Sequence, residues 1–243
     1  MKIINPDKVD STNSWVALHE GELPEEALVY SHIQTKGRGQ KGNSWESAPG
    51  KNITASLLIH PKDFLASDQF LISEAVSLAI VSFLNRYGIE AEIKWPNDIY
   101  VGNKKICGIL VENIILGKHI TRSIAGFGIN VNQKVFESDA PNPVSMSNIT
   151  GMEYNIADLV ETVAKDIEFY LGRIGDKEGV HEEYISRLWR NNGKKYGFYD
   201  RKAGEHIKAA IHSVAPSGIL TLALECGDKR EYAFKEVEYI LSE

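Results

Sequence analysis

The segment from Gln34 to Asn52, QTKGRGQKGNSWESAPGKN, has a composition suited to binding an anion. It contains four glycines and four cations but almost no aliphatic side chain. Glycine backbone can approach a phosphate or carboxylate closely, because it tolerates positive φ. Arg38 adds a planar fork of donors for a carboxylate, phosphate or ureido oxygen, and Trp45 offers a flat face for a base or ring. The alternative interpretation is a solvated, flexible loop.

This segment does not match the common phosphate-binding motifs. Gly37, Gly39 and Gly42 have neither the GK[ST] ending of a P-loop nor the GxGxxG spacing of a dinucleotide fingerprint. No Ser-His-Asp or Cys-His arrangement is evident elsewhere, because the seven histidines are scattered and Cys107 is expected to be a buried strand residue.

Three further polar clusters interrupt the chain at the ends of predicted strands: DSTN (10–13), KWPND (94–98) and the pair Lys104–Lys105. The first has a structural explanation, since Asp, Ser and Thr are good helix N-caps, although a capped helix start also presents backbone N–H groups. Lys105 opens an apolar strand, where a lysine usually extends toward water. Beside Asn97 and Asp98 it is instead a candidate for contact with a reacting phosphate.

The overall charge confines any anion site to a local cluster. The chain has 27 Lys and Arg against 33 Asp and Glu, a formal charge of −6, which argues against bulk affinity for nucleic acid or anionic membranes. Two distant cysteines, Cys107 and Cys226, form neither a disulfide framework nor a metal pair and favour a reducing compartment. The N-terminus lacks the pattern of a signal peptide, so we expect a cytoplasmic location.

The spacing of apolar residues predicts an α+β fold. Strands at Leu28–Ile33 and Ile53–Ile59 hold both ends of the glycine-rich segment. Ser67 or Asp68 is expected to cap a helix that Gly88 terminates. The apolar runs that follow are separated by turns of hairpin length, which indicates an antiparallel meander rather than βαβ units.

The end of the chain has a different pattern. Asn155 is expected to cap a helix that ends at about Leu171, and a third helix is predicted over 180–190. After Gly193 the chain consists of short apolar runs with tight turns, which predict a small β-barrel of marginal stability on its own. We therefore place a large domain at residues 1–193 and a small one at 194–243.

Four motifs together resemble the biotin protein ligases, or biotin–[acetyl-CoA-carboxylase] ligases, which attach biotin to a lysine of carboxylase carrier domains. They are DSTN, QTKGRGQKGNSWESAPGKN, KWPNDIYVGNKKICGILVE and GFGINVN (126–132), and they occur in the family's order and spacing. The resemblance implies the class II aminoacyl-tRNA synthetase and biotin–lipoate ligase type of α+β fold. That fold has a mixed, mainly antiparallel sheet with packed helices and a small C-terminal SH3-like β-barrel.

The resemblance also implies the chemistry. The carboxylate of biotin attacks the α-phosphate of ATP, so fixed positive charge, with Mg²⁺, must offset the repulsion of two anions. Lys105 matches the family's essential lysine, and Arg38 matches the loop arginine that contacts the adenylate. The product, biotinyl-5′-AMP, is a mixed anhydride sensitive to water, and the glycine-rich loop is expected to close over it.

By the same matching, the remaining site residues fall into two groups, and Asp98 is also assigned as the magnesium ligand. The biotin-binding residues are Ser11, Thr12, Asn13, Gln34, Gly37, Arg38, Gly39, Gln40, Lys105, Gly108, Gly126 and Gly128. The residues for ATP or the adenylate are Arg38, Gln40, Asn43, Trp45, Asn97, Asp98, Lys105 and Asn130.

The acceptor implied by the resemblance is a biotin carboxyl carrier protein or domain, and neither DNA nor a membrane is an expected partner. Bifunctional relatives carry an N-terminal DNA-binding domain, whereas here the first motif begins at Asp10, so we expect a stand-alone ligase. A homodimer and a monomer are both compatible with the sequence. The alternatives are a lipoate or octanoate ligase or transferase of the same fold, and a non-catalytic biotin-sensing or nucleic-acid-binding regulator.

The glycine-rich loop departs from the common family pattern GRGRxGR at Gln40 and Asn43, where many relatives have arginines. Two fixed charges near the adenylate are therefore missing. Neighbouring lysines are a partial substitute, because a lysine is a more mobile point charge than an arginine.

We predict that the Gln40→Arg variant releases biotinyl-5′-AMP more slowly than the wild type, because the added guanidinium holds the phosphate. The measurement is the rate of adenylate release from each protein. Equal release rates would contradict the prediction.

Overall fold

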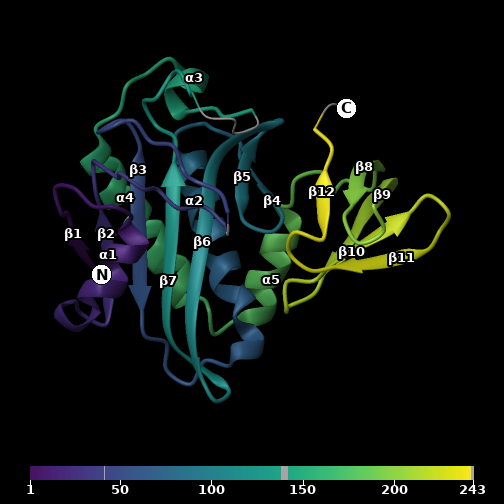
Figure 1. The fold of residues 1–243 in the computed structure, drawn as a ribbon, viewed down its shortest axis with the longest axis horizontal. Helices are drawn as coiled ribbons and strands as arrows, with labels where there is room; N and C mark the ends of the chain where they lie inside the picture. The colour runs from purple at the N-terminus through teal and green to yellow at the C-terminus, as the bar shows by residue number, and fades with distance from the viewer. Residues whose placement is uncertain (41, 138–141, 242–243) are drawn as a thin grey trace.

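A mixed, mainly antiparallel β-sheet and a smaller antiparallel β-sheet lie side by side in the computed structural model, which describes residues 1–40, 42–137 and 142–241 (Figure 1). The larger sheet has seven strands in the order β1-β2-β3-β7-β6-β5-β4, and within it β1 and β2 pair in parallel. Its strands are β1 (Lys2–Ile4), β2 (Glu26–Tyr30), β3 (Ile53–Ile59), β4 (Glu92–Lys94), β5 (Asp98–Val101), β6 (Lys104–Leu116) and β7 (His119–Ile129).

The smaller sheet has five strands in the order β11-β10-β9-β8-β12, all paired antiparallel. Its strands are β8 (Tyr196–Asp200), β9 (Glu205–Val214), β10 (Leu220–Leu224), β11 (Lys229–Tyr232) and β12 (Val237–Tyr239). The helices are α1 (Thr12–His19), α2 (Phe70–Arg86), α3 (Met146–Thr150), α4 (Ile156–Gly172) and α5 (Lys177–Ser186), with 3₁₀ turns η1 (Glu20–Glu22) and η2 (Ala66–Asp68).

The larger sheet is covered on both faces. Helices α2, α4 and α5 pack together against one face, where the main core lies. A separate apolar cluster contains Val16 of α1 together with Val29, Leu58 and Ile124 of the sheet. Successive strand residues point to opposite faces, and Leu57, next to Leu58, belongs to the main core. Helix α1 therefore covers the opposite face.

Helix α2 is the central element of the main core. The segment Ala66–Arg86 is long and apolar enough to cross a membrane, but 78% of its most apolar window is buried inside the protein. Its composition is therefore explained by packing between the sheet, α4 and α5.

Most predicted elements are confirmed. Strand β3 has the predicted bounds, the meander from β4 to β7 is antiparallel, and the Asn155 side chain caps α4 by accepting from the Ala157 backbone N–H at 2.9 Å. The smaller sheet fits the predicted SH3-like domain. The boundary between residues 193 and 194 stays a prediction.

Two helix boundaries were predicted wrongly. Helix α2 begins at Phe70 after the turn η2, so neither Ser67 nor Asp68 caps it. Helix α5 ends at Ser186, not at 190, because the chain then pairs with the edge strand β4: the Ile93 N–H donates to the Arg187 carbonyl at 2.8 Å, and the Trp189 N–H donates to the Ile93 carbonyl at 2.9 Å. Strand β1 and helix α3 had no clear sequence signal, since each is very short.

Aromatic side chains join the two sheets. The Trp95 indole N–H donates to the Gly218 carbonyl at 2.9 Å, and Phe234 lies between Trp95 and Phe70 with ring centroids 5.4 and 5.7 Å away. These contacts pack the loop after β11 against Trp95 and α2, so the smaller sheet is docked on the larger domain.

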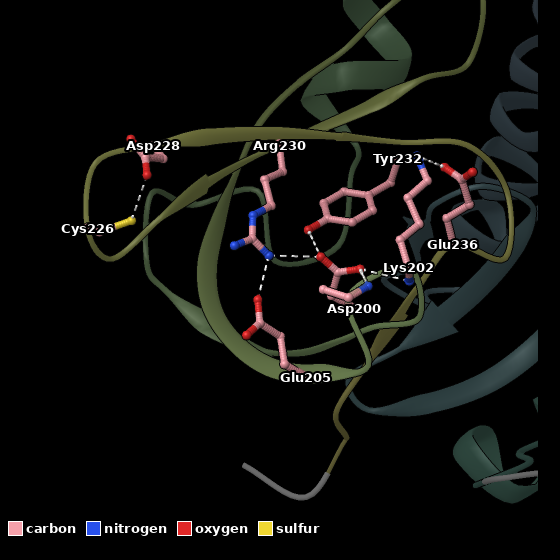
Figure 2. A network of polar contacts seen from close by, with 9 residues as sticks. Asp200, Lys202, Glu205, Cys226, Asp228, Arg230, Tyr232 and Glu236 are labelled. Atoms are coloured by element: carbon pink, nitrogen blue, oxygen red, sulfur yellow. Dashed lines mark hydrogen bonds and ion pairs between the residues drawn. The ribbon is translucent and has the colours of Figure 1, made fainter.

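A buried carboxylate organises the smaller sheet (Figure 2). Asp200 accepts hydrogen bonds from the Tyr232 hydroxyl at 2.8 Å and from the Arg230 guanidinium at 2.9 Å, as well as from two backbone N–H groups of the β8–β9 turn. Burial raises the pKa of this carboxyl, but hydrogen bonds from Ala203, Tyr232 and Arg230 outweigh burial and hold the pKa below its usual value of 3.8.

We predict that Asp200→Ala lowers the free energy of unfolding by about 2–3 kcal/mol at pH 7, because it leaves the Tyr232 hydroxyl and Arg230 without their partner. A carboxyl with a depressed pKa in the folded state stabilises the fold above its unfolded pKa and loses this effect as the pH falls through the folded value. The difference from wild type should therefore shrink below about pH 3.8.

Urea unfolding between pH 7 and pH 3 measures this difference. Asp228→Ala, which removes an exposed carboxylate of the same sheet, is the control and should change the stability by less than about 0.5 kcal/mol. A loss for Asp200→Ala that is independent of pH would contradict the assignment.

Candidate active site

One cavity of about 960 Å³ is lined by parts of both sheets, the start of α1 and the glycine-rich segment. Every site residue predicted from the sequence lines this cavity except Gly37. Those that line it are Ser11, Thr12, Asn13, Gln34, Arg38, Gly39, Gln40, Asn43, Trp45, Asn97, Asp98, Lys105, Gly108, Gly126, Gly128 and Asn130. The structure thus brings the four motifs together, while the ligand that each residue contacts stays a prediction.

The glycine-rich segment has a hairpin-like backbone at its tip. The Gly39 N–H donates to the Asn43 carbonyl at 3.0 Å, and the Trp45 N–H donates to the Gly37 carbonyl at 2.9 Å. A Cβ on Gly37 would lie 2.3 Å from the Trp45 carbonyl oxygen. Gly37 therefore permits the two arms to approach each other. These contacts favour an ordered cavity wall over the alternative of a loose linker.

The Trp45 ring lies against the floor of the cavity. A Cβ on Gly128 would come within 2.3 Å of the ring, and one on Gly108 within 3.1 Å, so glycine at both positions gives the ring its place. The Lys105 ammonium lies 5.7 Å from the ring centroid, within reach of a cation–π interaction. The indole N–H is buried and has no hydrogen-bond partner in the described part of the chain.

The start of α1 faces the cavity, but the predicted side-chain cap is absent. Ser11 occupies the N-cap position without a capping hydrogen bond. Instead, the backbone N–H and the hydroxyl of Thr12 both donate to Gln34 Oε1, at 2.8 and 3.2 Å. Ser56 Oγ lies 2.7 Å from the Thr12 hydroxyl. Residues distant in the sequence, Gln34 and Ser56, thus contact the polar groups of Thr12, which capping preferences assign to the helix N-terminus.

Asn13 is held entirely by protein groups. Its Oδ1 accepts from Ser56 Oγ at 2.6 Å, and its Nδ2 donates to the Leu110 carbonyl at 3.3 Å and to Glu112 Oε2 at 2.8 Å. A Cβ on Gly126 would lie 2.1 Å from Asn13 Oδ1, so this glycine makes room for the amide. These bonds use the amide to anchor α1 to the sheet.

Two lysines share one carboxylate at the other end of the cavity. Lys105 Nζ lies 2.6 Å from Asp98 Oδ1, and Lys94 Nζ lies 3.9 Å from Asp98 Oδ2. The Lys94 ammonium also lies about 5 Å from the ring centroids of Tyr100 and Tyr239. Burial lowers the pKa of Lys94. The pair of cations can neutralise an anion that displaces them from Asp98.

The side-chain amides of Asn97 and Asn130 each donate one hydrogen bond to a backbone carbonyl. Asn97 Nδ2 donates to the Ile109 carbonyl at 2.5 Å, and Asn130 Nδ2 donates to the Val144 carbonyl at 3.1 Å. Each amide is thereby oriented at the cavity wall. Cys107 is fully buried, as predicted, and burial raises the pKa of its thiol, which makes it a poor nucleophile.

Several cavity residues were missed at the sequence level. Lys94 belongs to the KWPND motif and could have been chosen from it. Ser56 and Glu112 do not line the cavity but hold residues that do: Glu112 ends the longer motif that begins at Lys94, whereas Ser56 interrupts an apolar run outside the four motifs. The smaller sheet and its loops contribute Arg201, Lys235, Val237, Glu238 and Tyr239. These last residues lie in no motif, so only the docking of the two sheets identifies them.

Comparison with known sequences connects this site to one family. The profile of the Biotin/lipoate A/B protein ligase family matches residues 6–130, just over half of the chain. Bifunctional ligase/repressor BirA of Bacillus spizizenii is 32% identical over 167 residues, covering 66% of this chain and 51% of that protein. Biotin–protein ligase 1, chloroplastic, of Arabidopsis thaliana is 34% identical over 239 residues, covering 92% of this chain and 62% of that protein. The chain thus spans about half to three fifths of the length of these relatives.

Comparison of structures confirms the predicted fold class. The biotin protein ligase from Aquifex aeolicus in complex with biotin and ATP superimposes with a TM-score of 0.76, covering 98% of this chain and 99% of that chain at 24% sequence identity. At this level of identity the similarity establishes the fold.

We predict that Gly128→Ala displaces the Trp45 ring from the cavity, because the added methyl group would overlap the indole. The tryptophan emission maximum of the unliganded protein should move to longer wavelength as the ring reaches water. The shift should be absent when Trp45→Phe is already present, which separates Trp45 from the other three tryptophans.

The matched control is Gly175→Ala, since a Cβ there meets nothing within 4 Å. Its emission spectrum should equal that of wild type. An emission spectrum of Gly128→Ala equal to that of wild type would contradict the packing of the Trp45 ring against Gly128.

Proposed function

Because the chain belongs to the biotin/lipoate A/B protein ligase family, we propose that it activates biotin with ATP to biotinyl-5′-AMP and transfers the biotinyl group to a lysine of a biotin carboxyl carrier domain. The observation that carries this proposal is the single cavity in which the Lys105–Asp98 pair, glycine backbone of β6 and β7, and the arginine-bearing loop meet. The names of the matching relatives support biotin over lipoate as the substrate.

The first reaction step joins two anions. A carboxylate oxygen of biotin forms a bond to the α-phosphorus of ATP, and the bond from that phosphorus to the pyrophosphate oxygen breaks. Lys105 supplies a positive charge at this position when it leaves Asp98 for the ligand, and its separation of 2.6 Å from Asp98 keeps it oriented until then. Lys94, a second cation beside Asp98, adds to the same field.

The carboxylate of Asp98 also fits a magnesium ion carried by the nucleotide. The described residues include no group of three or more His, Cys, Asp or Glu side chains placed to hold a metal. Mg²⁺ in nucleotide sites ordinarily takes one or two carboxylates together with phosphate oxygens. Asp98 would hold the ion, which would help neutralise the phosphates; the two lysines would then be free for the ligand.

The second step transfers the acyl group. The uncharged amine of the acceptor lysine attacks the acyl carbon of the mixed anhydride, an amide bond forms, AMP leaves, and the amine's proton passes to solvent. Water competes for the same carbon, so the glycine-rich hairpin and Trp45 are proposed to exclude it. Arg38, on this hairpin, is proposed to hold the phosphate of the adenylate.

We propose a cytoplasmic location and a carrier domain of a biotin-dependent carboxylase as the partner, in line with the ATP-dependent reaction. The acidic balance of the chain supports the absence of DNA and of anionic membranes among its partners.

We predict biotin-dependent exchange of pyrophosphate into ATP by the wild-type protein, followed by a mass increase on one lysine of a carrier domain. Lys105→Ala should lower the exchange rate by about 100-fold or more, the effect typical of removing one charge-stabilising group. Lys104→Ala is the control, because Lys104 precedes Lys105 on β6, is exposed and does not line the cavity; its rate should be near wild type.

Three results would overturn this function. Exchange with lipoate or octanoate but not with biotin would indicate the related ligase activity. Biotin binding without any exchange would indicate a non-catalytic regulator. Undiminished exchange by Lys105→Ala would refute the role of that lysine.

A further inference from the structure

Arg38 of the glycine-rich loop forms an ion pair with Glu112, a carboxylate that lies outside the ligand cavity. Glu112 of β6 receives Arg38 in a two-pronged ion pair, with Nη2 at 2.5 Å from Oε1 and Nη1 at 3.2 Å from Oε2. Arg38 Nη1 also lies 3.3 Å from Ser14 Oγ of α1. Both partners of the pair are partly exposed, so the pair can break when a stronger partner arrives.

Glu112 holds the guanidinium from the side facing away from the ligand cavity. Arg38 lines two hollows: the ligand cavity, and an open depression of about 450 Å³ lined by Ser14, Ala17, Leu18, Glu112 and Arg122 among others. Glu112 lines the second and not the first. Arg38 and Asn13 line both hollows, so Glu112 contacts the arginine from the second hollow while the arginine stays at the wall of the ligand cavity.

Glu112 itself is held by Asn13, a buried side chain of the site. Its Oε2 accepts from Asn13 Nδ2 at 2.8 Å. Asn13 is only 3% exposed and is held by Ser56 and the Leu110 carbonyl, in a space that Gly126 leaves open. The carboxylate is thus held by Asn13 independently of its pair with Arg38.

A series of close side-chain contacts leads from Glu112 back to Gln34, at the start of the glycine-rich segment. The chain of side chains runs from Gln34 through Thr12, Ser56, Asn13 and Glu112 to Arg38. The closest polar atoms of adjacent members lie between 2.5 and 3.2 Å apart. A loop side chain is in this way connected to a buried network on α1, β3 and β6.

We propose that Glu112 is a positioning residue that acts through Arg38: it pre-orders the glycine-rich loop in the unliganded protein, so that the arginine is already at the cavity wall when the adenylate forms. This inference rests on the proposed function. Its physical basis is preorganisation, because an arginine restrained beforehand loses less conformational freedom on binding.

A purely electrostatic role would have the opposite sign. A carboxylate beside an arginine offsets its charge and weakens its attraction for a phosphate. Removing the carboxylate would then strengthen adenylate binding, whereas removing a positioning group weakens it. The direction of the change in adenylate release therefore separates the two.

The main test compares Glu112→Ala, Glu112→Gln and wild type. For Glu112→Ala we expect release of biotinyl-5′-AMP to be about tenfold faster and the KM for ATP to rise by a similar factor, the equivalent of one charge-assisted hydrogen bond. The KM for biotin should stay within about twofold. Glu112→Gln keeps an oxygen acceptor at this position and should restore part of the effect. Unchanged or slower release from Glu112→Ala would overturn the proposal.

The matched control is Glu183→Ala. Glu183 pairs with Arg173 at 2.6 Å and also accepts from the Tyr170 hydroxyl, with exposure close to that of Glu112, but it does not line the cavity. This variant loses an ion pair of the same kind and should release the adenylate at the wild-type rate. A faster release here would show that lost stability, rather than positioning, explains the result.

Two further measurements test the path of the effect. In the Arg38→Ala background, Glu112→Ala should increase the rate of adenylate release by less than about twofold, because Glu112 acts through Arg38. In the unliganded protein, trypsin should cleave after Arg38 several-fold faster in Glu112→Ala than in wild type or Glu183→Ala. A full additional effect without Arg38, or equal cleavage, would overturn the proposal.

The cleavage assay also separates this inference from the proposed function. If the wild type forms no adenylate, the proposed function fails, while the rate of cleavage still reports whether Glu112 orders the loop.

Discussion

The register between β6 and β7 is the constraint on which the site depends. It sets Gly108 opposite Gly128, Leu110 opposite Gly126, and Glu112 opposite Ile124. The first pair leaves room for the Trp45 ring, and Gly126 leaves room for the Asn13 amide. Because alternate strand residues face opposite sides, a shift by one residue would place side chains where the ring and the amide now lie. One backbone pairing thus positions both ends of the cavity.

The cavity wall carries several positive side chains, although the protein as a whole is negatively charged. The chain carries a net charge of −6, yet Lys94 and Lys105 converge on Asp98, and Arg38 is held at the opposite wall by Glu112. In both places a carboxylate restrains a cation, and we propose that the cation leaves this carboxylate to form an ion pair with a phosphate of the ligand. Such restraint keeps the cations oriented without the repulsion that a bare cluster would have.

The smaller sheet contributes to the same cavity although it lies at the end of the chain. Tyr239 of β12 lies near the Lys94 ammonium, and the Trp95 indole donates to the Gly218 carbonyl beside it. The Asp200 network ties the β8–β9 turn to β11. Arg201, the next residue in the chain, lines the cavity. The stability of the smaller sheet is in this way connected to the shape of the site.

The sequence by itself determined the elements and the kinds of residue at the site. Apolar runs separated by turns of hairpin length specified the antiparallel meander, and apolar residues at helical spacing specified α4 with its Asn155 cap. Four ordered motifs contain all the predicted site residues, and all of these but Gly37 line the cavity. These features are local, since spacing and capping act within a few residues of the chain.

Tertiary structure alone decided how these residues are used. It turned Thr12 from helix capping to contacts with Gln34 and Ser56, and it anchored Asn13 to the sheet. It also ended α5 early through pairing with β4, and it joined Glu112 to Arg38 across 74 positions of the chain. It also brought the smaller sheet to the cavity. The physical reason is that such contacts follow from strand register and the packing of distant elements, which local propensity does not encode.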